Sequence, residues 1–476
     1  MQNYVDDPVV QKHRWWIITA VGMFTIMSTL DASIVNIALP VMSRDLHIPM
    51  NQAEWVVSIY LIVICALLLL MGKLGDTIGK IRVFRIGTVL FTIGSLFAGF
   101  NHSFMLLLAA RFVQALGASM TMATNNGIIT EVFPFKERGK ALGLIGSFVA
   151  VGSIAGPGLG GLILGALPWG YIFWINVPIG VATIIIGQVV LPKDIRQTHA
   201  RIDWLGFGSF FVTIVALFVG IFIGQVTGFA APLVLALFAV AVVALGLFLV
   251  TERGVAEPLV SLSLFKNFEF SISLLAGFMI FITNFFFNVI APFYLENARG
   301  LGATKAGYLL MVFPIVQVVV APLAGSLSDK IGPYKITLVG LILILFNQLG
   351  YAVLGLSTPW AVVALLIGLV GLGNGVFQSP NNTIVMSSVA PSELGIAGGL
   401  NALARNLGMV VGISTATTVL FSAMSAHAGK KVTTYVAGRP DLFIGGMHVV
   451  FLVAAGFCVV SILLTATRMI AMRKAH

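Results

Sequence analysis

The chain has 476 residues, of which 58% are hydrophobic and only 9% are charged. A soluble protein carries about 25% charged residues, so a chain of this length could not cover a water-facing surface with so few. This argues against a soluble enzyme, a nucleic-acid binder and a disordered protein. The mean hydropathy of +1.03 indicates that lipid is the main solvent, and the meaning of the net charge of +10 then depends on where the charges lie.

The apolar run that begins after Arg14 is too long for the core of a cleaved signal peptide and has no small-residue cleavage site. We therefore expect it to be the first permanent span. The two cysteines, Cys65 and Cys458, both lie in apolar runs, so we expect packing residues and no disulfide framework.

Apolar runs separated by charged or turn-rich breaks predict fourteen transmembrane helices, because only helices satisfy their own backbone groups within lipid. The predicted spans are 15–40, 52–72, 82–100, 103–126, 140–165, 171–190, 204–224, 231–251, 270–293, 305–325, 335–356, 360–388, 395–424 and 446–469. The fold class is thus an all-α membrane protein with multiple passes.

The basic residues predict the orientation. An even number of spans places both termini on one side, and that side holds nineteen of the 27 Lys and Arg residues, while the other side holds six. Two more, Arg111 and Arg405, fall within spans. The excess predicts that both termini are cytoplasmic and that the protein lies in the plasma or inner cell membrane. Contact with anionic lipid explains the basic character, so no nucleic-acid partner is expected.

The second half of the chain repeats the first. Asn36–Pro40 matches Asn288–Pro292, and Gly72–Gly79 matches Gly325–Gly332. Two similar six-helix halves that face each other across a midplane cavity are typical of secondary carriers. We therefore predict a cytoplasmic N-terminus (1–14), a first six-helix half (15–190), two inserted helices with their loops (191–269), a second six-helix half (270–469) and a cytoplasmic C-terminus (470–476).

Asp31 is the only acidic residue that this interpretation places deep in a span, where a charge costs about 2.5–3.5 kcal/mol on insertion scales. Asp31 lies nine residues before Pro40, and Arg111 lies eight residues after Ser103. At 1.5 Å per residue both lie roughly 12–14 Å below the same membrane boundary. A pair is therefore possible, with Gln114 within reach of either partner.

Each member of this pair also has a purely structural interpretation: Asp31 as a hydrogen-bond acceptor for a neighbouring helix, and Arg111 as an anchor for helix ends. The functional interpretation is a proton- or cation-binding site. If the pair opens when the cavity changes sides, the affinity of Asp31 for a proton changes with it. Such a difference couples proton binding to conformation.

The fifth predicted span contains glycines at one-face spacing together with a proline: Gly152, Gly156, Pro157, Gly160 and Gly161. The glycines alone would fit a packing stripe. Because the proline also removes a helix hydrogen bond, we expect a hinge or a seal.

The loop after the second span has Gly72 and Gly79 around Asp76. Asp76 is expected either to cap a helix start or to pair with a base, and so to latch one conformation. Asp329 is its counterpart in the repeat.

These segments together resemble the major facilitator superfamily, and within it the fourteen-helix drug:proton antiporter branch. The resemblance spans nearly the whole chain and is carried by the segments Leu30–Pro40, Gly72–Gly79, Arg111–Gly117, Gly152–Gly161 and Ile172–Gly180. It implies the major facilitator fold, alternating access and proton-coupled export.

The substrate is expected to be a lipophilic neutral or monocationic organic compound. Spans 305–325 and 395–424 contain no acid, which argues against polycations. An apolar cavity with few polar groups suits amphiphilic molecules. Its candidate polar residues are Asn36, Tyr60, Gln114, Asn284, Asn288, Gln317 and Gln378.

We expect the partners to be a small organic molecule, protons and membrane lipids, with the chain acting as a monomer and using no metal and no cofactor. The alternatives are an exporter of a specific metabolite, peptide or lipid, and a membrane sensor derived from a transporter. An enzyme is not expected, since the chain has neither a zinc-protease helix nor a nucleophile-elbow motif.

Overall fold

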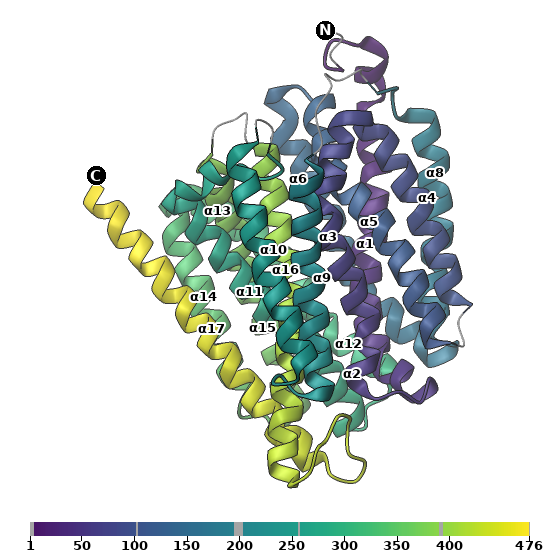
Figure 1. The fold of residues 1–476 in the computed structure, drawn as a ribbon, viewed down its shortest axis with the longest axis vertical. Helices are drawn as coiled ribbons and strands as arrows, with labels where there is room; N and C mark the ends of the chain where they lie inside the picture. Colours follow the sequence, from purple (N-terminus) through teal and green to yellow (C-terminus); the bar gives the residue numbers. More distant parts are fainter. Residues whose placement is uncertain (1–3, 101–102, 195–202, 256–257, 390–393, 476) are drawn as a thin grey trace. The chain divides into compact units, whose positions relative to one another are not determined.

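The computed structural model describes residues 4–100, 103–194, 203–255, 258–389 and 394–475. These residues form helices and no strand. Fourteen helices in this part of the chain are long and apolar enough to cross a membrane, which confirms the predicted number of spans. Figure 1 shows the helices as a ribbon.

The helices fall into two compact units. Unit 1 comprises 1–33, 56–156 and 168–262, and unit 2 comprises 34–55, 157–167 and 263–476. Two helices run from one unit into the other: α1 (Pro8–Asp45) and α6 (Phe135–Ala166). The other helices of unit 1 are α3 (Trp55–Ile78), α4 (Lys80–Gly99), α5 (Phe104–Val132), α7 (Tyr171–Trp174), α8 (Asn176–Val190), α9 (Trp204–Thr227) and α10 (Pro232–Gly254).

The other helices of unit 2 lie mostly in the second half of the chain. They are α2 (Met50–Ala53), η1 (Leu262–Lys266), α11 (Phe268–Phe293), η2 (Tyr294–Ala298), α12 (Ala303–Leu310), α13 (Val312–Ile331), α14 (Pro333–Tyr351), α15 (Trp360–Ser387), α16 (Leu394–Ala428) and α17 (Pro440–Ala475).

Three predicted spans are broken in the structure. The span that begins near residue 52 is broken between α2 and α3 at Glu54, the span 171–190 between α7 and α8 at Ile175, and the span 305–325 between α12 and α13 at Met311. The ninth span continues past its predicted end, because α11 passes into the π-helical turn η2.

The internal repeat is visible in the backbone. Gly79 precedes α4 with φ 108°, and Gly332 precedes α14 with φ 92°. Both angles lie in a region that residues with a Cβ rarely adopt. The two matched loops therefore end in the same kind of turn.

Each unit has its own apolar core. In unit 1 Phe24 of α1 packs edge-on against Phe84 and Phe91 of α4, with ring centroids 5.9 and 5.3 Å apart. In unit 2 Ile280, Phe377 and Cys458 belong to one buried cluster. Both cysteines are free and buried, which confirms that they are packing residues.

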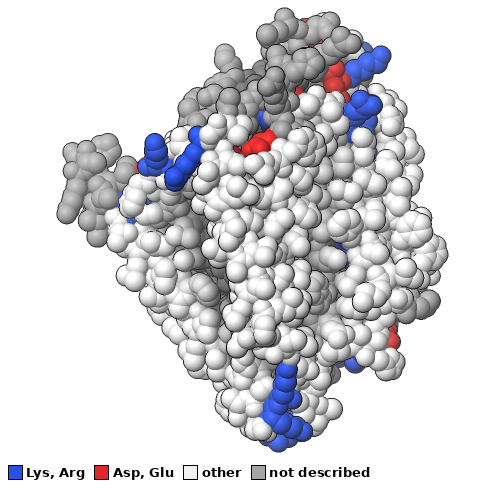
Figure 2. Space-filling view, in the orientation of Figure 1, with Lys and Arg blue, Asp and Glu red and all other residues white. Residues whose placement is uncertain are grey.

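Apolar side chains also cover the outside. Val242 and Val243 of α10 are 70% and 72% exposed, as expected for a helix that faces lipid. On the face shown in Figure 2, the visible charged side chains lie mainly near the ends of helices and the surface between them is uncharged. This chain is a multi-pass membrane protein.

Candidate functional site

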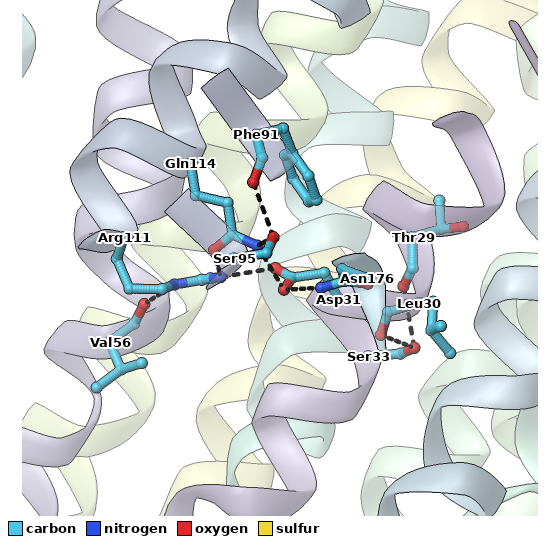
Figure 3. A network of polar contacts seen from close by, with 10 residues as sticks. All are labelled: Thr29, Leu30, Asp31, Ser33, Val56, Phe91, Ser95, Arg111, Gln114 and Asn176. Carbon is cyan, nitrogen blue, oxygen red and sulfur yellow. Dashed lines mark hydrogen bonds and ion pairs between the residues drawn. The ribbon is translucent and has the colours of Figure 1, made fainter. Parts of the chain in front are cut away.

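The candidate site of unit 1 is a polar network around Asp31, which lies in the middle of α1 (Figure 3). Arg111 of α5 donates from Nη1 to Asp31 Oδ2 at 2.6 Å. The other carboxylate oxygen, Oδ1, accepts from Gln114 Nε2 at 2.8 Å and from Asn176 Nδ2 at 2.9 Å. Both carboxylate oxygens thus accept hydrogen bonds, from three donors on two helices.

The guanidinium of Arg111 is held as firmly as its partner. Its Nε donates to the carbonyl oxygen of Val56 at 2.8 Å, and Nη1 also donates to Gln114 Oε1 at 2.6 Å. Its central carbon lies 4.2 Å from the ring centroid of Tyr60 and 5.6 Å from that of Phe173. The aromatic faces favour the cation where water is absent.

The site is closed to water in this conformation. Asp31, Arg111 and Gln114 each have 0% exposure. Arg111 Nη2 has no hydrogen-bond partner among the described residues, but the ion pair itself compensates both charges. Removing either partner would leave an uncompensated buried charge.

Two members of the network were not among the predicted site residues. Asn176 begins α8, and Ser95 of α4 accepts from Gln114 Nε2 at 2.9 Å. Asn176 lies inside the segment Ile172–Gly180, which carries the family resemblance, so a signal for it existed. A serine in a membrane helix is common and gives no such signal.

Sequence analysis places only Asp31 deep in a span, and the structure also buries three acids that lie near helix ends. Glu54, Glu252 and Glu296 have exposures of 0%, 4% and 9%. All three lie at the end of a helix or next to a break in one, where the sequence alone predicts contact with water or lipid headgroups. Neighbouring helices cover them instead.

The glycines of α6 allow close packing on two sides. A Cβ on Gly152 would lie 2.0 Å from Thr29 Oγ1 of α1, within unit 1. Within unit 2, a Cβ on Gly161 would lie 3.0 Å from the carbonyl oxygen of Ala303, and Thr304 Oγ1 donates to the Gly161 carbonyl at 2.8 Å. The helix remains continuous through Pro157.

Asp76 has one of its two predicted roles. Its carboxylate pairs with Lys80 Nζ at 3.1 Å, and Lys80 also contacts Glu131. The start of α4 is capped by a different residue, Asp194, whose Oδ1 and Oδ2 accept from the backbone N–H groups of Ile81 and Arg82 at 2.8 Å each. The chain after α8 therefore supplies the cap that the loop sequence suggested for Asp76.

Asp194→Ala is expected to lower the free energy of unfolding by about 0.5–2 kcal/mol, since it removes a helix cap. Asp76→Ala is the matched control, because its ion pair is 46% exposed on the carboxylate side and such pairs contribute about 0–1 kcal/mol. Thermal unfolding in detergent measures both. An equal loss in the two variants would contradict the assignment of the cap to Asp194.

In unit 2 the predicted polar residues form amide pairs. Asn284 of α11 and Asn374 of α15 exchange two hydrogen bonds, at 2.6 and 2.7 Å. Gln317 of α13 donates to Gln378 of α15 at 3.2 Å. Asn288 instead donates to the carbonyl of Asn284 in its own helix, at 2.9 Å. These contacts of unit 2 thus involve neutral amides, whereas the network of unit 1 contains an ion pair.

Three further residues complete the comparison with the prediction. Asn36 is 4% exposed and belongs to unit 2. The side chain of Asp329 lies outside the described part of the structure. Arg468, which the sequence places at the end of the last span, is fully buried in α17 and donates to Ser273 of α11.

Comparison with known proteins gives a consistent result. The model of the family described as "Major Facilitator Superfamily" matches residues 21–413. The chain is 33% identical over 463 residues to "Riboflavin transporter RibZ" of Clostridioides difficile, covering 95% of this chain and 97% of that protein. It is 30% identical over 447 residues to "Methylenomycin A resistance protein" of Streptomyces coelicolor, covering 92% of each.

A more distant relative is "Multidrug transporter protein MdtP" of Bacillus subtilis, with 27% identity over 424 residues, 89% of this chain and 77% of that protein. Among solved structures, a bacterial homologue of the human lysosomal transporter Spinster superposes with a TM-score of 0.67 at 14% identity, covering 96% of this chain and 97% of that one. The structural match supports the same fold.

Proposed function

Because the chain belongs to the Major Facilitator Superfamily, we propose that it is a proton-coupled antiporter that exports lipophilic neutral or monocationic organic compounds by alternating access. The observation that carries this proposal is the buried Asp31–Arg111 pair, at 2.6 Å. The relatives named for resistance to methylenomycin A and for multidrug transport support export of organic compounds.

The hydrogen bonds of Asp31 give the coupling a physical basis. All three groups that contact the carboxylate are N–H donors. A proton on either oxygen would replace an acceptor by a donor and would weaken the attraction of Arg111. Protonation and the closed network therefore exclude each other, so that binding of a proton requires a change of conformation.

In the proposed cycle Asp31 releases its proton to the cytoplasm, the network closes and the substrate binds. After the cavity has turned outward, the network opens and Asp31 takes up a proton. A pH gradient supplies about 1.36 kcal/mol per pH unit for each proton. We further propose that both termini are cytoplasmic and that the chain acts as a monomer with one coupling proton.

Charge balance tests this stoichiometry. In proteoliposomes at a fixed pH gradient, exchange of one proton for a monocation should not respond to the membrane potential, whereas exchange of one proton for a neutral compound should respond. The measurement is uptake of one dye of each kind while the potential is varied. Equal responses for the two dyes would contradict a single coupling proton.

A second candidate is a transporter for one metabolite. It is favoured by the relative named for riboflavin, which matches almost the whole chain, and by the neutral amide pairs of unit 2. Counterflow in proteoliposomes with riboflavin and with cationic dyes separates the candidates. Exchange of riboflavin alone would replace the multidrug assignment, and binding without counterflow would indicate a sensor.

A further inference from the structure

Glu54 is a second fully buried acid, and it belongs to unit 2. It lies at the break between α2 and α3 with 0% exposure. Within the described residues neither carboxyl oxygen is reached by an N–H donor or a cation, and the group that the carboxyl contacts is the hydroxyl of Thr417 in α16. An ionised carboxylate without such partners is costly to bury.

Burial indicates which form of Glu54 fits. The hydroxyl of Thr417 can donate to an ionised carboxylate or accept from a protonated one, so this contact is compatible with both forms. The carboxyl is fully buried, and neither of its oxygens has a hydrogen-bond partner that meets normal geometry among the described residues. Because burying an ionised carboxylate without a cation or an N–H donor is costly, the protonated acid is the form that fits this position.

The charged groups of the surrounding elements do not neutralise Glu54. Arg44 of α1 pairs with Glu296 of η2 at 3.7 Å, and Arg439 pairs with Asp441 of α17 at 2.8 Å. The ring of His427 bonds to a carbonyl of its own helix.

Three other titratable groups of these elements, Asp45 of α1, Lys305 of α12 and Arg405 of α16, form no ion pair with Glu54 among the residues described. Arg405 is twelve residues from Thr417, which is about 18 Å along the helix. No cation among the described residues balances the charge of a Glu54 carboxylate, so we expect a proton to neutralise it.

The contact joins the two sequence repeats. Glu54 belongs to the first repeat and Thr417 to the second, yet both lie in unit 2. The hydrogen bond from Thr304 to Gly161 joins the repeats in the same unit. Within unit 2, α2 lies near the end at which α17 begins (Figure 1). The Lys and Arg distribution predicts that this end is extracytoplasmic.

We propose that Glu54 is a second proton-binding site, which takes its proton from the extracytoplasmic compartment and holds the α2–α16 contact closed. The proposal rests on alternating access, in which the repeats separate at one end at a time. Separation exposes Glu54 to water and allows the proton to leave. Because the proton enters and leaves on one side, Glu54 adds nothing to the transport stoichiometry.

Because the proton comes from the extracytoplasmic side, the external pH controls the contact. Low external pH keeps Glu54 protonated and the contact closed, and rising pH favours the open form, in which the ionised carboxylate is hydrated. Spin labels on Asp45→Cys and Ala426→Cys report the opening, because both positions are exposed and lie in unit 2. The two native cysteines are buried and do not compete for the label.

We expect the open population to rise with pH in the labelled parent protein and to stay low at every pH in Glu54→Gln, which mimics the protonated acid. An unchanged pH response in Glu54→Gln would overturn the proposal. Infrared spectroscopy provides a second measurement on the unmodified protein: a protonated carboxyl band is expected that Glu54→Gln removes. If no band is lost in Glu54→Gln, the site is not protonated.

Asp31→Asn separates this inference from the proposed function. The Asp31→Asn protein should keep the pH response of the labels, because Glu54 is intact. If Asp31→Asn transports normally while Glu54→Gln loses its pH response, the coupling role of Asp31 fails and the Glu54 site stands. If Asp31→Asn itself removes the response, Glu54 is not an independent site.

Discussion

Replacing Asp31 by asparagine is expected to abolish proton release by substrate and to reduce proton-driven transport to the level of empty liposomes. An amide of the same size cannot take up and release a proton at physiological pH, whereas the carboxylate of Asp31 is the charge that binds Arg111 in the closed network. The measurement is the proton released when substrate is added to the purified protein, together with uptake driven by a pH gradient.

The control for this experiment is Asp45→Asn. Asp45 ends the same helix but is exposed, so its replacement should leave proton release and uptake unchanged. Substrate binding, measured by fluorescence, shows whether the Asp31→Asn protein still forms its cavity. Full proton-driven transport by Asp31→Asn would refute the proposed role of this carboxylate.

The second large effect is expected for stability. Arg111→Gln leaves the Asp31 carboxylate buried without its cation, which typically costs about 3–5 kcal/mol of unfolding free energy. The double variant Asp31→Asn/Arg111→Gln removes both charges and should be more stable than Arg111→Gln alone. Thermal unfolding of the two single variants and the double variant measures this coupling.

An exposed pair serves as the comparison for the buried one. Arg439 and Asp441 are 57% and 59% exposed in their own ion pair, and Arg439→Gln should hardly change the unfolding midpoint. Additive losses in the Asp31 and Arg111 variants would indicate that the two residues do not stabilise each other, despite the short distance between them.

Much of the candidate site could be predicted because depth in a membrane helix follows from residue number. The equal depth of Asp31 and Arg111 predicted a possible pair, and the structure brings them to 2.6 Å. Gln114 lies one helical turn from Arg111, and the structure brings it to both partners. The roles of these residues in proton coupling remain a proposal.

The residues that sequence analysis missed are those whose environment is supplied by a distant part of the chain. Asp194 follows α8 but caps α4. The sequence places Glu54 at the membrane interface, but in the structure it is fully buried and contacts Thr417 of α16. No local pattern contains the partner in either case, because the two segments are separated by more than one hundred residues.

The sequence by itself determined that this protein is a bundle of fourteen apolar helices built from a repeat. That outcome is local, since each apolar run must satisfy its own backbone hydrogen bonds in lipid. Only the tertiary structure decided which acids are paired, which are capping residues and which are buried without a cation. Those differences depend on how each helix is rotated about its axis and on which residues pack against it. The hydropathy of a segment predicts neither of these.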